Sequence, residues 1–165
     1  MNSAAHAGFT YLWEVVKNGE VIDSWIDHNL MPTEGANHML ESALANGTRY
    51  TAWYLALYEG NYTPTIADTA ATLPAAAVEC TAYSGSTRKT WTPGSAAAGV
   101  VDNSASRAEF TFTSAKTVYG GFLTSASAKS ATTGALMSVV KFTTPRVLDI
   151  DSVLRVTAGI NLTSI

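Results

Sequence analysis

Short β-strands separated by turn residues fill the chain from about residue 83 to its C-terminus, and this pattern limits the fold more than any other feature. The run 152–163 is the clearest, because its apolar residues recur at every second position. A period of two is typical of a strand that buries one face. The strands predicted in this part of the chain lie at 87–91, 98–103, 106–113, 116–124, 134–143 and 152–163.

A β-hairpin is predicted for residues 9–29. Two β-rich runs flank Asn18-Gly19, and an Asn-Gly pair tolerates the positive φ angles of the tight turn that joins hairpin strands. The second run carries Trp25 on one face and Ile22 and Ile26 on the other. We therefore expect both faces of the hairpin to be covered, by the rest of the domain or by a partner.

One helix is predicted after the hairpin. It begins at Pro32-Thr33, where we expect Thr33 to act as a cap and Glu34 to favour the positive end of the helix. Asn46-Gly47 ends it. Five apolar residues recur on one face of this helix at the spacing of its turns: Ala36, Met39, Leu40, Ala43 and Leu44.

A strand is predicted for residues 51–58, with its aromatic side chains outside and its aliphatic side chains inside. The connection 60–80 that follows permits a short helical turn after Asp68 but not a strand, and its length is typical of an interaction loop.

About eight strands with one early helix predict a mainly β protein, an antiparallel β-sandwich of jelly-roll-like type with one short helix after the N-terminal hairpin. Residues 1–8 are predicted to form an N-terminal arm that a neighbouring subunit anchors, and residues 9–165 a single domain.

Charge and composition exclude several classes of partner. The chain has 10 Lys and Arg against 13 Asp and Glu, a net charge of 10 − 13 = −3, and only 14% of its residues are charged. This balance is unlike that of a nucleic-acid-binding protein, which carries a basic patch. The chain has no apolar run long enough to span a membrane and no secretory signal, so we expect synthesis in the cytoplasm and no membrane partner.

The sequence gives no positive sign of catalysis. His28 and His38, with Asp27 beside the first, match no metal-binding spacing. Ser84-Gly85-Ser86 lacks the pattern of a nucleophile elbow, and Cys80 has no neighbouring cation to activate it. We therefore expect no enzyme activity, no cofactor and no metal.

Aromatic residues are unusually frequent, with four Trp and seven Tyr. Such residues are enriched at protein interfaces because they bury a large area and keep a polar group. About half of them are expected to fill the core. From the other Trp and Tyr residues we take Tyr54, Tyr58, Tyr62 and Trp91 as protein-interface candidates. His6 and Phe9, near the N-terminus, are two further candidates.

Several stretches resemble small structural proteins of tailed bacteriophages. They are packing and turn residues rather than an active site, and together they cover the chain from about 28 to 163. The matching stretches are HNLMPTEG at 28–35 with HML at 38–40, WYLALY at 53–58, YSGSTRKTWTPG at 83–94, NSAS at 103–106 and GGFL at 120–123. In the family's strand motif a Gly is common where this chain has Ala56.

The resemblance implies a place in the virion. We expect a capsid decoration or cement protein on the capsid surface, which stabilises the coat lattice through contacts with the phage major capsid protein and with copies of itself as a homo-oligomer. A tail or fibre-associated component is the alternative within the virion, although the chain lacks heptads and repeats. A glycan-binding β-sandwich module is the alternative from another class, suggested by the Trp and Tyr residues.

Overall fold

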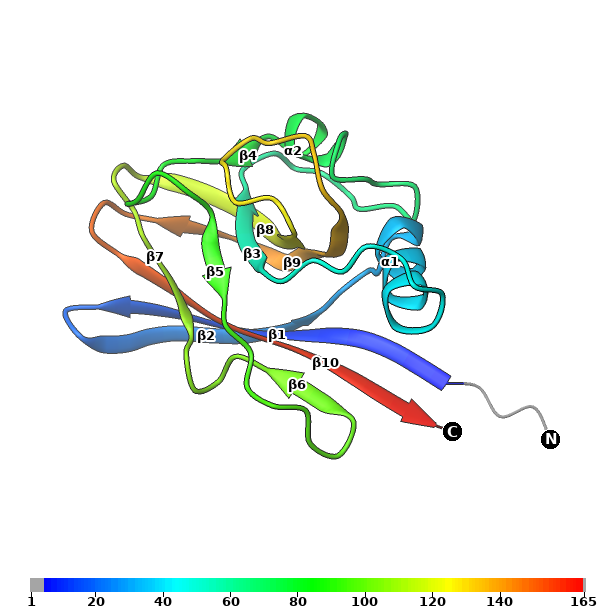
Figure 1. Ribbon diagram of the computed structural model, residues 1–165. Coiled ribbons are helices and arrows are strands. Elements are labelled where there is room, and N and C mark those ends of the chain that lie inside the picture. The colour runs from blue at the N-terminus through cyan, green and yellow to red at the C-terminus, as the bar shows by residue number, and fades with distance from the viewer. Residues whose placement is uncertain (1–4, 165) are drawn as a thin grey trace.

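Antiparallel strands dominate the computed structural model, which describes residues 5–164 (Figure 1). The protein is mainly β, with 49% strand and 10% helix. Sheet A contains β1 (Ala5–Lys17), β2 (Glu20–His28), β6 (Val100–Asp102), β7 (Ala108–Thr111) and β10 (Val153–Ser164). Sheet B contains β3 (Trp53–Tyr58), β4 (Glu79–Cys80), β5 (Lys89–Trp91), β8 (Lys116–Thr124) and β9 (Leu136–Leu148).

The predicted hairpin is confirmed as β1 and β2. Asn18 and Gly19 have φ angles of 54° and 83° and form its turn. β1 begins at Ala5, which pairs with Ser164 of β10. Residues 5–8, which we expected in the arm, therefore belong to a strand that β10 of the same chain holds, and residues 1–4 lie outside the described part.

The strands predicted after residue 83 are also confirmed, and β8 has the predicted bounds. β9 continues five residues beyond its predicted end and passes through Pro145. Gly120 pairs with Lys141 and Val118 with Arg146, so β9 carries an irregular bulge between these pairs. Pro145 lies within this bulge. Proline is tolerated in a bulge because it has no backbone N–H group to donate to the neighbouring strand.

The core lies between the two sheets and is rich in aromatic rings. Trp13 of β1 stacks on Trp25 of β2, with 6.3 Å between ring centroids, and Phe142 of β9 meets Trp13 edge-on at 4.8 Å. The buried Tyr11 hydroxyl donates a hydrogen bond to Ser138 of sheet B at 2.8 Å. Residues of sheet A and sheet B therefore share one core.

Helix α1 (Thr33–Leu44) lies at one end of the molecule, as Figure 1 shows. Its cap differs from the prediction, because Pro32 precedes the helix and no side chain caps it. Glu34 instead accepts hydrogen bonds from the backbone N–H groups of Ala70 and Leu136, at 2.8 and 2.7 Å. This carboxylate therefore fastens the start of α1 to sheet B and to the connection 60–80.

The connection 60–80 packs on the chain itself. It contains the short helix α2 (Leu73–Ala76), whose Leu73 is fully buried. The expectation of no strand is wrong at its end, where Glu79 and Cys80 form β4 and pair with Tyr58 and Leu57. A two-residue strand is too short for a periodic pattern to reveal.

Candidate functional site

Three of the predicted interface residues lie in the core of the chain. Phe9 and Trp91 are buried and meet edge-on, with ring centroids 6.3 Å apart. The Trp91 indole N–H donates to the backbone oxygen of Ala158 at 2.9 Å. Tyr58 is fully buried, and its hydroxyl donates to the backbone oxygen of Val140 at 3.0 Å. These rings are therefore covered by this chain, and the expected outward position of Tyr58 is wrong because β3 is buried on both faces from Leu55 onward.

The other three residues have different positions. Tyr54 is half-buried in β3. Tyr62 is half-buried in the connection 60–80, and its hydroxyl donates to Asp68 at 2.6 Å, which raises the pKa of Tyr62. His6 belongs to β1, but its side chain lies outside what the structure describes. The six candidates therefore do not form one continuous surface.

The outer face of the β1–β2 hairpin is apolar and open. Ile22 and Ile26 of β2 are 61% and 59% exposed, and the half-buried Leu12 of β1 is opposite Ile26 in the register. The inner face is covered, because Trp25 lies against Phe142 and beneath the Arg146 guanidinium. The chain itself therefore covers the inner face of the hairpin, and cover of the outer face by a partner stays a prediction.

Charged residues continue this outer face farther along sheet A. Glu14 of β1 accepts a hydrogen bond from Arg107 at 2.8 Å, and Arg155 of β10 pairs with Glu109 at 2.9 Å. Arg155 also lies 3.9 Å from Glu14. The two arginines and two glutamates balance in charge, so this part of the outer face has no net charge.

Helix α1 exposes most of its apolar face. Leu40 and Leu44, one turn apart, are 60% and 80% exposed, whereas Met39 packs on the core. Gly35 is the buried residue of the helix. Gly35 and Met39 face the rest of the chain, and the last turn of α1 beyond them remains open.

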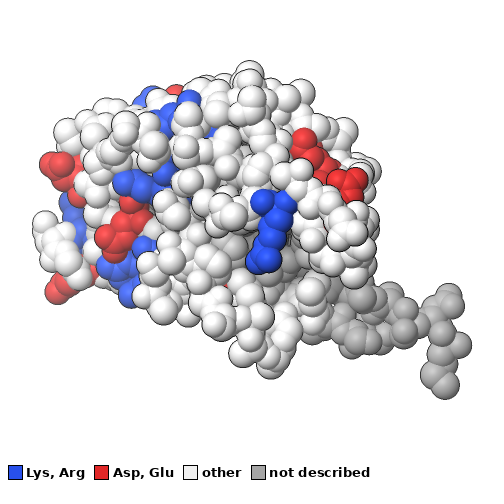
Figure 2. Space-filling model, viewed as in Figure 1, with Lys and Arg blue, Asp and Glu red and all other residues white. Residues whose placement is uncertain are grey.

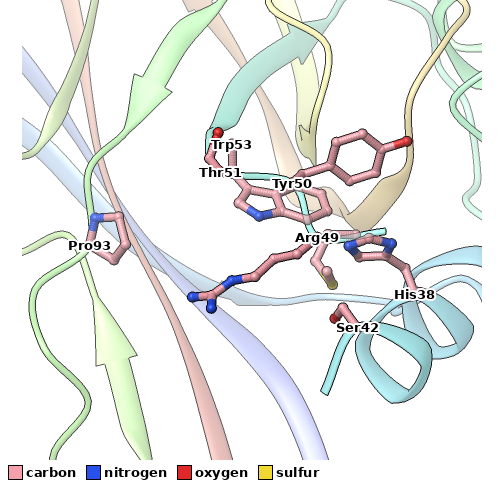
Figure 3. Close-up of a pocket in the computed structure, with 8 residues that line it drawn as sticks. His38, Ser42, Arg49, Tyr50, Thr51, Trp53 and Pro93 are labelled. Carbon is pink, nitrogen blue, oxygen red and sulfur yellow. The ribbon is translucent and has the colours of Figure 1, made fainter. Parts of the chain in front are cut away.

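A pocket of about 470 Å³ lies between α1 and the start of β3 (Figure 3). Its lining consists of His38, Ser42, Arg49, Tyr50, Thr51, Trp53, Pro93 and Met137. In Figure 3 the Arg49 side chain is extended, and its guanidinium points away from His38 toward the side of the pocket where Pro93 lies.

Three rings of this pocket contact one another. His38 lies 4.9 Å from Tyr50 and 5.4 Å from Trp53, and the Tyr50 and Trp53 rings meet at an interplanar angle of 80°. His38 comes from α1, whereas Tyr50 and Trp53 come from the segment that leads into β3 and from its first residue. The only sequence signal for this cluster is the crowding of aromatic residues after residue 50.

A second pocket of about 320 Å³ shares His38 and Tyr50 with the first, and two carboxylates, Glu34 and Glu41, are among its lining residues. His28 lies elsewhere, near Thr10 of β1, so the structure does not bring it together with His38. Among residues 5–164 no group of three or more His, Cys, Asp or Glu side chains is placed to hold a metal ion.

No family model, curated protein or solved structure matches the chain. Neither helix in the described part is long and apolar enough to cross a membrane.

Proposed function

We propose that this protein is a structural component of a bacteriophage particle, a capsid decoration protein that binds the phage major capsid protein and copies of itself. It would act on the capsid surface, after synthesis in the host cytoplasm, by burying surface against its partners and without catalysis. The sequence resemblance supplies the virion context. The observation that carries the contact mechanism is the open apolar face of the β1–β2 hairpin.

This face offers a partner large side chains that the chain itself leaves in water. Ile22 and Ile26 are exposed on the edge strand β2, and Ile26 pairs with Leu12 of β1. Full burial of such a side chain contributes about 1.5–3 kcal/mol relative to leaving it exposed. An edge strand with exposed isoleucines is also a surface on which another polypeptide can pack or pair.

The charge distribution favours broad and neutral contacts. Figure 2 shows that on the viewed face most charged side chains gather toward one end, and wide areas between the charges are neutral. Neutral surface needs no desolvation of unpaired charges when it is covered, and specific interfaces bury about 1,600 Å² in total. A protein repeated many times over a lattice would gain from such contacts at every copy.

The scaffold that we propose for this role is a β-sandwich of jelly-roll type. Its support is the pairing of the first strand with the last, since β1 and β10 run side by side from Ala5 and Ser164 to Val16 and Val153. In such a scaffold the loops and one sheet edge remain free for contacts.

Binding to separated heads and tails tests the proposal. Heads and tails of a phage that lacks the gene for this protein are separated on a density gradient, and each fraction is mixed with the purified protein. We expect saturable co-sedimentation with heads. Binding confined to tails would support the tail component instead, and binding to neither fraction would contradict a role in the particle.

A further inference from the structure

We propose that the pocket between α1 and β3 binds a saccharide that carries a carboxylate group. In this assignment Arg49 pairs with the carboxylate, and the rings of Tyr50 and Trp53 contact the sugar. The inference is independent of the proposed place in the virion, because it rests on the side chains of the pocket alone.

Within residues 5–164 Arg49 is the lysine or arginine that remains available to a ligand. The other nine lysines and arginines each donate to a carboxylate, a hydroxyl or a backbone oxygen, as Lys89 does to Ser84 and Lys141 to Thr63. Among residues 5–164 Arg49 has neither a hydrogen-bond partner nor an ion-pair partner. A guanidinium presents its donors as a rigid fork, which matches the two oxygens of a carboxylate.

The aromatic residues supply flat apolar surfaces beside this cation. Tyr50 and Trp53 are both half-buried, and their rings stand almost at right angles with centroids 5.9 Å apart. One ring can therefore lie against the apolar C–H face of a sugar while the other meets its edge. His38 supports both rings from α1, which holds their relative orientation.

The remaining lining suits a ligand that is rich in hydroxyl groups. Six of the eight lining residues carry a polar side-chain group, the exceptions being Pro93 and Met137. Thr51 contributes a hydroxyl that can both donate and accept, whereas the Ser42 hydroxyl donates to the backbone oxygen of Met39 at 3.3 Å and can still accept. A volume of about 470 Å³ lies within the range of small-molecule sites, roughly 300–1,000 Å³.

The neighbouring carboxylates favour a singly charged ligand over a phosphorylated one. Glu41 and Glu34 line the adjacent pocket, with the shared residues His38 and Tyr50 between the two. A phosphate with nearly two negative charges would be repelled by these carboxylates and matched by one arginine only. A carboxylate can be neutralised by a single guanidinium, and Arg49 provides one in this pocket.

Titration with paired acidic and neutral sugars tests the assignment. The probes are galacturonate with its uncharged methyl ester, and sialyllactose with lactose. Binding is followed by intrinsic fluorescence, since Trp53 lines the pocket, and by isothermal titration calorimetry. We expect saturable binding of at least one acidic probe, and binding about tenfold weaker for its neutral counterpart, which lacks the charge-assisted hydrogen bonds.

Arg49→Gln and Tyr50→Leu identify the site, with Arg107→Gln as the matched control on sheet A. Arg49→Gln should weaken the acidic probe about tenfold and leave the neutral one unchanged, whereas Tyr50→Leu should weaken both. Circular dichroism spectra establish that each variant folds. Arg107→Gln should bind the acidic probe as tightly as the wild type. The assignment is overturned if neither acidic probe binds at concentrations up to about 10 mM, or if Arg49→Gln binds the acidic probe as tightly as Arg107→Gln does.

Discussion

Glu79 and Arg88 form a bidentate ion pair in which each side chain is only 1% exposed. Arg88 Nε donates to Glu79 Oε1 at 3.0 Å and its Nη2 to Oε2 at 2.7 Å. Arg88 Nη1 and Nη2 also donate to the backbone oxygens of Ala126 and Ala131, at 3.0 and 3.1 Å. Glu79 also accepts the N–H of Ser130 at 3.0 Å. The pair therefore fastens β4 to the loop that joins β8 and β9.

Removal of one member of this pair should destabilise the protein strongly. Arg88→Met leaves a buried carboxylate without its partner, for which we expect a loss of about 3–5 kcal/mol in the free energy of unfolding. Urea denaturation measures this value. Arg155→Gln, which breaks an exposed pair with Glu109, serves as the control and should cost less than about 1 kcal/mol. Equal effects of the two substitutions would contradict the role given to Arg88.

Gly35 allows α1 to lie directly on β9. A Cβ atom at this position would stand 2.6 Å from the backbone oxygen of Met137 and 2.8 Å from that of Leu136. Gly35→Ala should therefore destabilise the protein by about 1–3 kcal/mol, although alanine favours a helix by about 1 kcal/mol.

The control for this prediction is Gly94→Ala. A Cβ atom there would meet its nearest neighbour, the backbone oxygen of Asp102, at 3.9 Å. Thermal or urea unfolding of both variants provides the comparison. A Gly35→Ala protein as stable as Gly94→Ala would show that α1 does not need this close approach.

Cys80 should make the stability of the protein fall at alkaline pH. Burial raises the pKa of its thiol from 9.0 to about 11. A group whose pKa is higher in the folded state contributes stability that is fully present below the unfolded value and is lost as pH rises toward the folded one. We therefore expect the free energy of unfolding to decrease between pH 9 and 11.

Cys80→Ala isolates this effect. The variant lacks the thiol, so its free energy of unfolding should decrease less over the same range of pH than that of the wild type. Burial also raises the pKa values of Tyr11, Tyr58 and Tyr83, and these remain in both proteins. Parallel pH profiles for the two proteins would show that Cys80 titrates alike in the folded and unfolded chains.

The strands and the hairpin could be predicted from the sequence because their signals are local. Asn18-Gly19 specifies a turn by the φ angles that its residues tolerate, and β8 follows from the residues between two turns. The length of β9 could not be predicted in this way. Pro145 predicts the end of a strand, whereas a bulge lets β9 continue past it.

Burial was less predictable, because it depends on contacts between distant segments. The apolar spacing in α1 does not reveal that Leu40 and Leu44 are exposed while Gly35 lies against β9. The alternation in β3 predicts a strand with one open face and Tyr58 on that face. In the structure β3 is buried on both faces from Leu55 to Tyr58. The pocket at Arg49 likewise requires the juxtaposition of α1, β3 and the segment after β5, which no local pattern encodes.

The outer face of the β1–β2 hairpin is the surface through which we propose that the protein binds the capsid. Ile22→Ser with Ile26→Ser removes the exposed apolar side chains, and because they are exposed the free energy of unfolding should change by less than about 1 kcal/mol. Loss of two buried contacts of about 1.5 kcal/mol each predicts roughly 100-fold weaker binding to phage heads in the co-sedimentation assay. Leu44→Ser on α1 is the matched control.

The most direct measurement is the dissociation constant of each variant, and of the wild-type protein, for heads of a phage that lacks the gene for this protein. We expect the dissociation constant to increase about 100-fold for the double variant and to stay unchanged for Leu44→Ser. Unchanged binding of the double variant, or an equal loss in Leu44→Ser, would contradict the proposal.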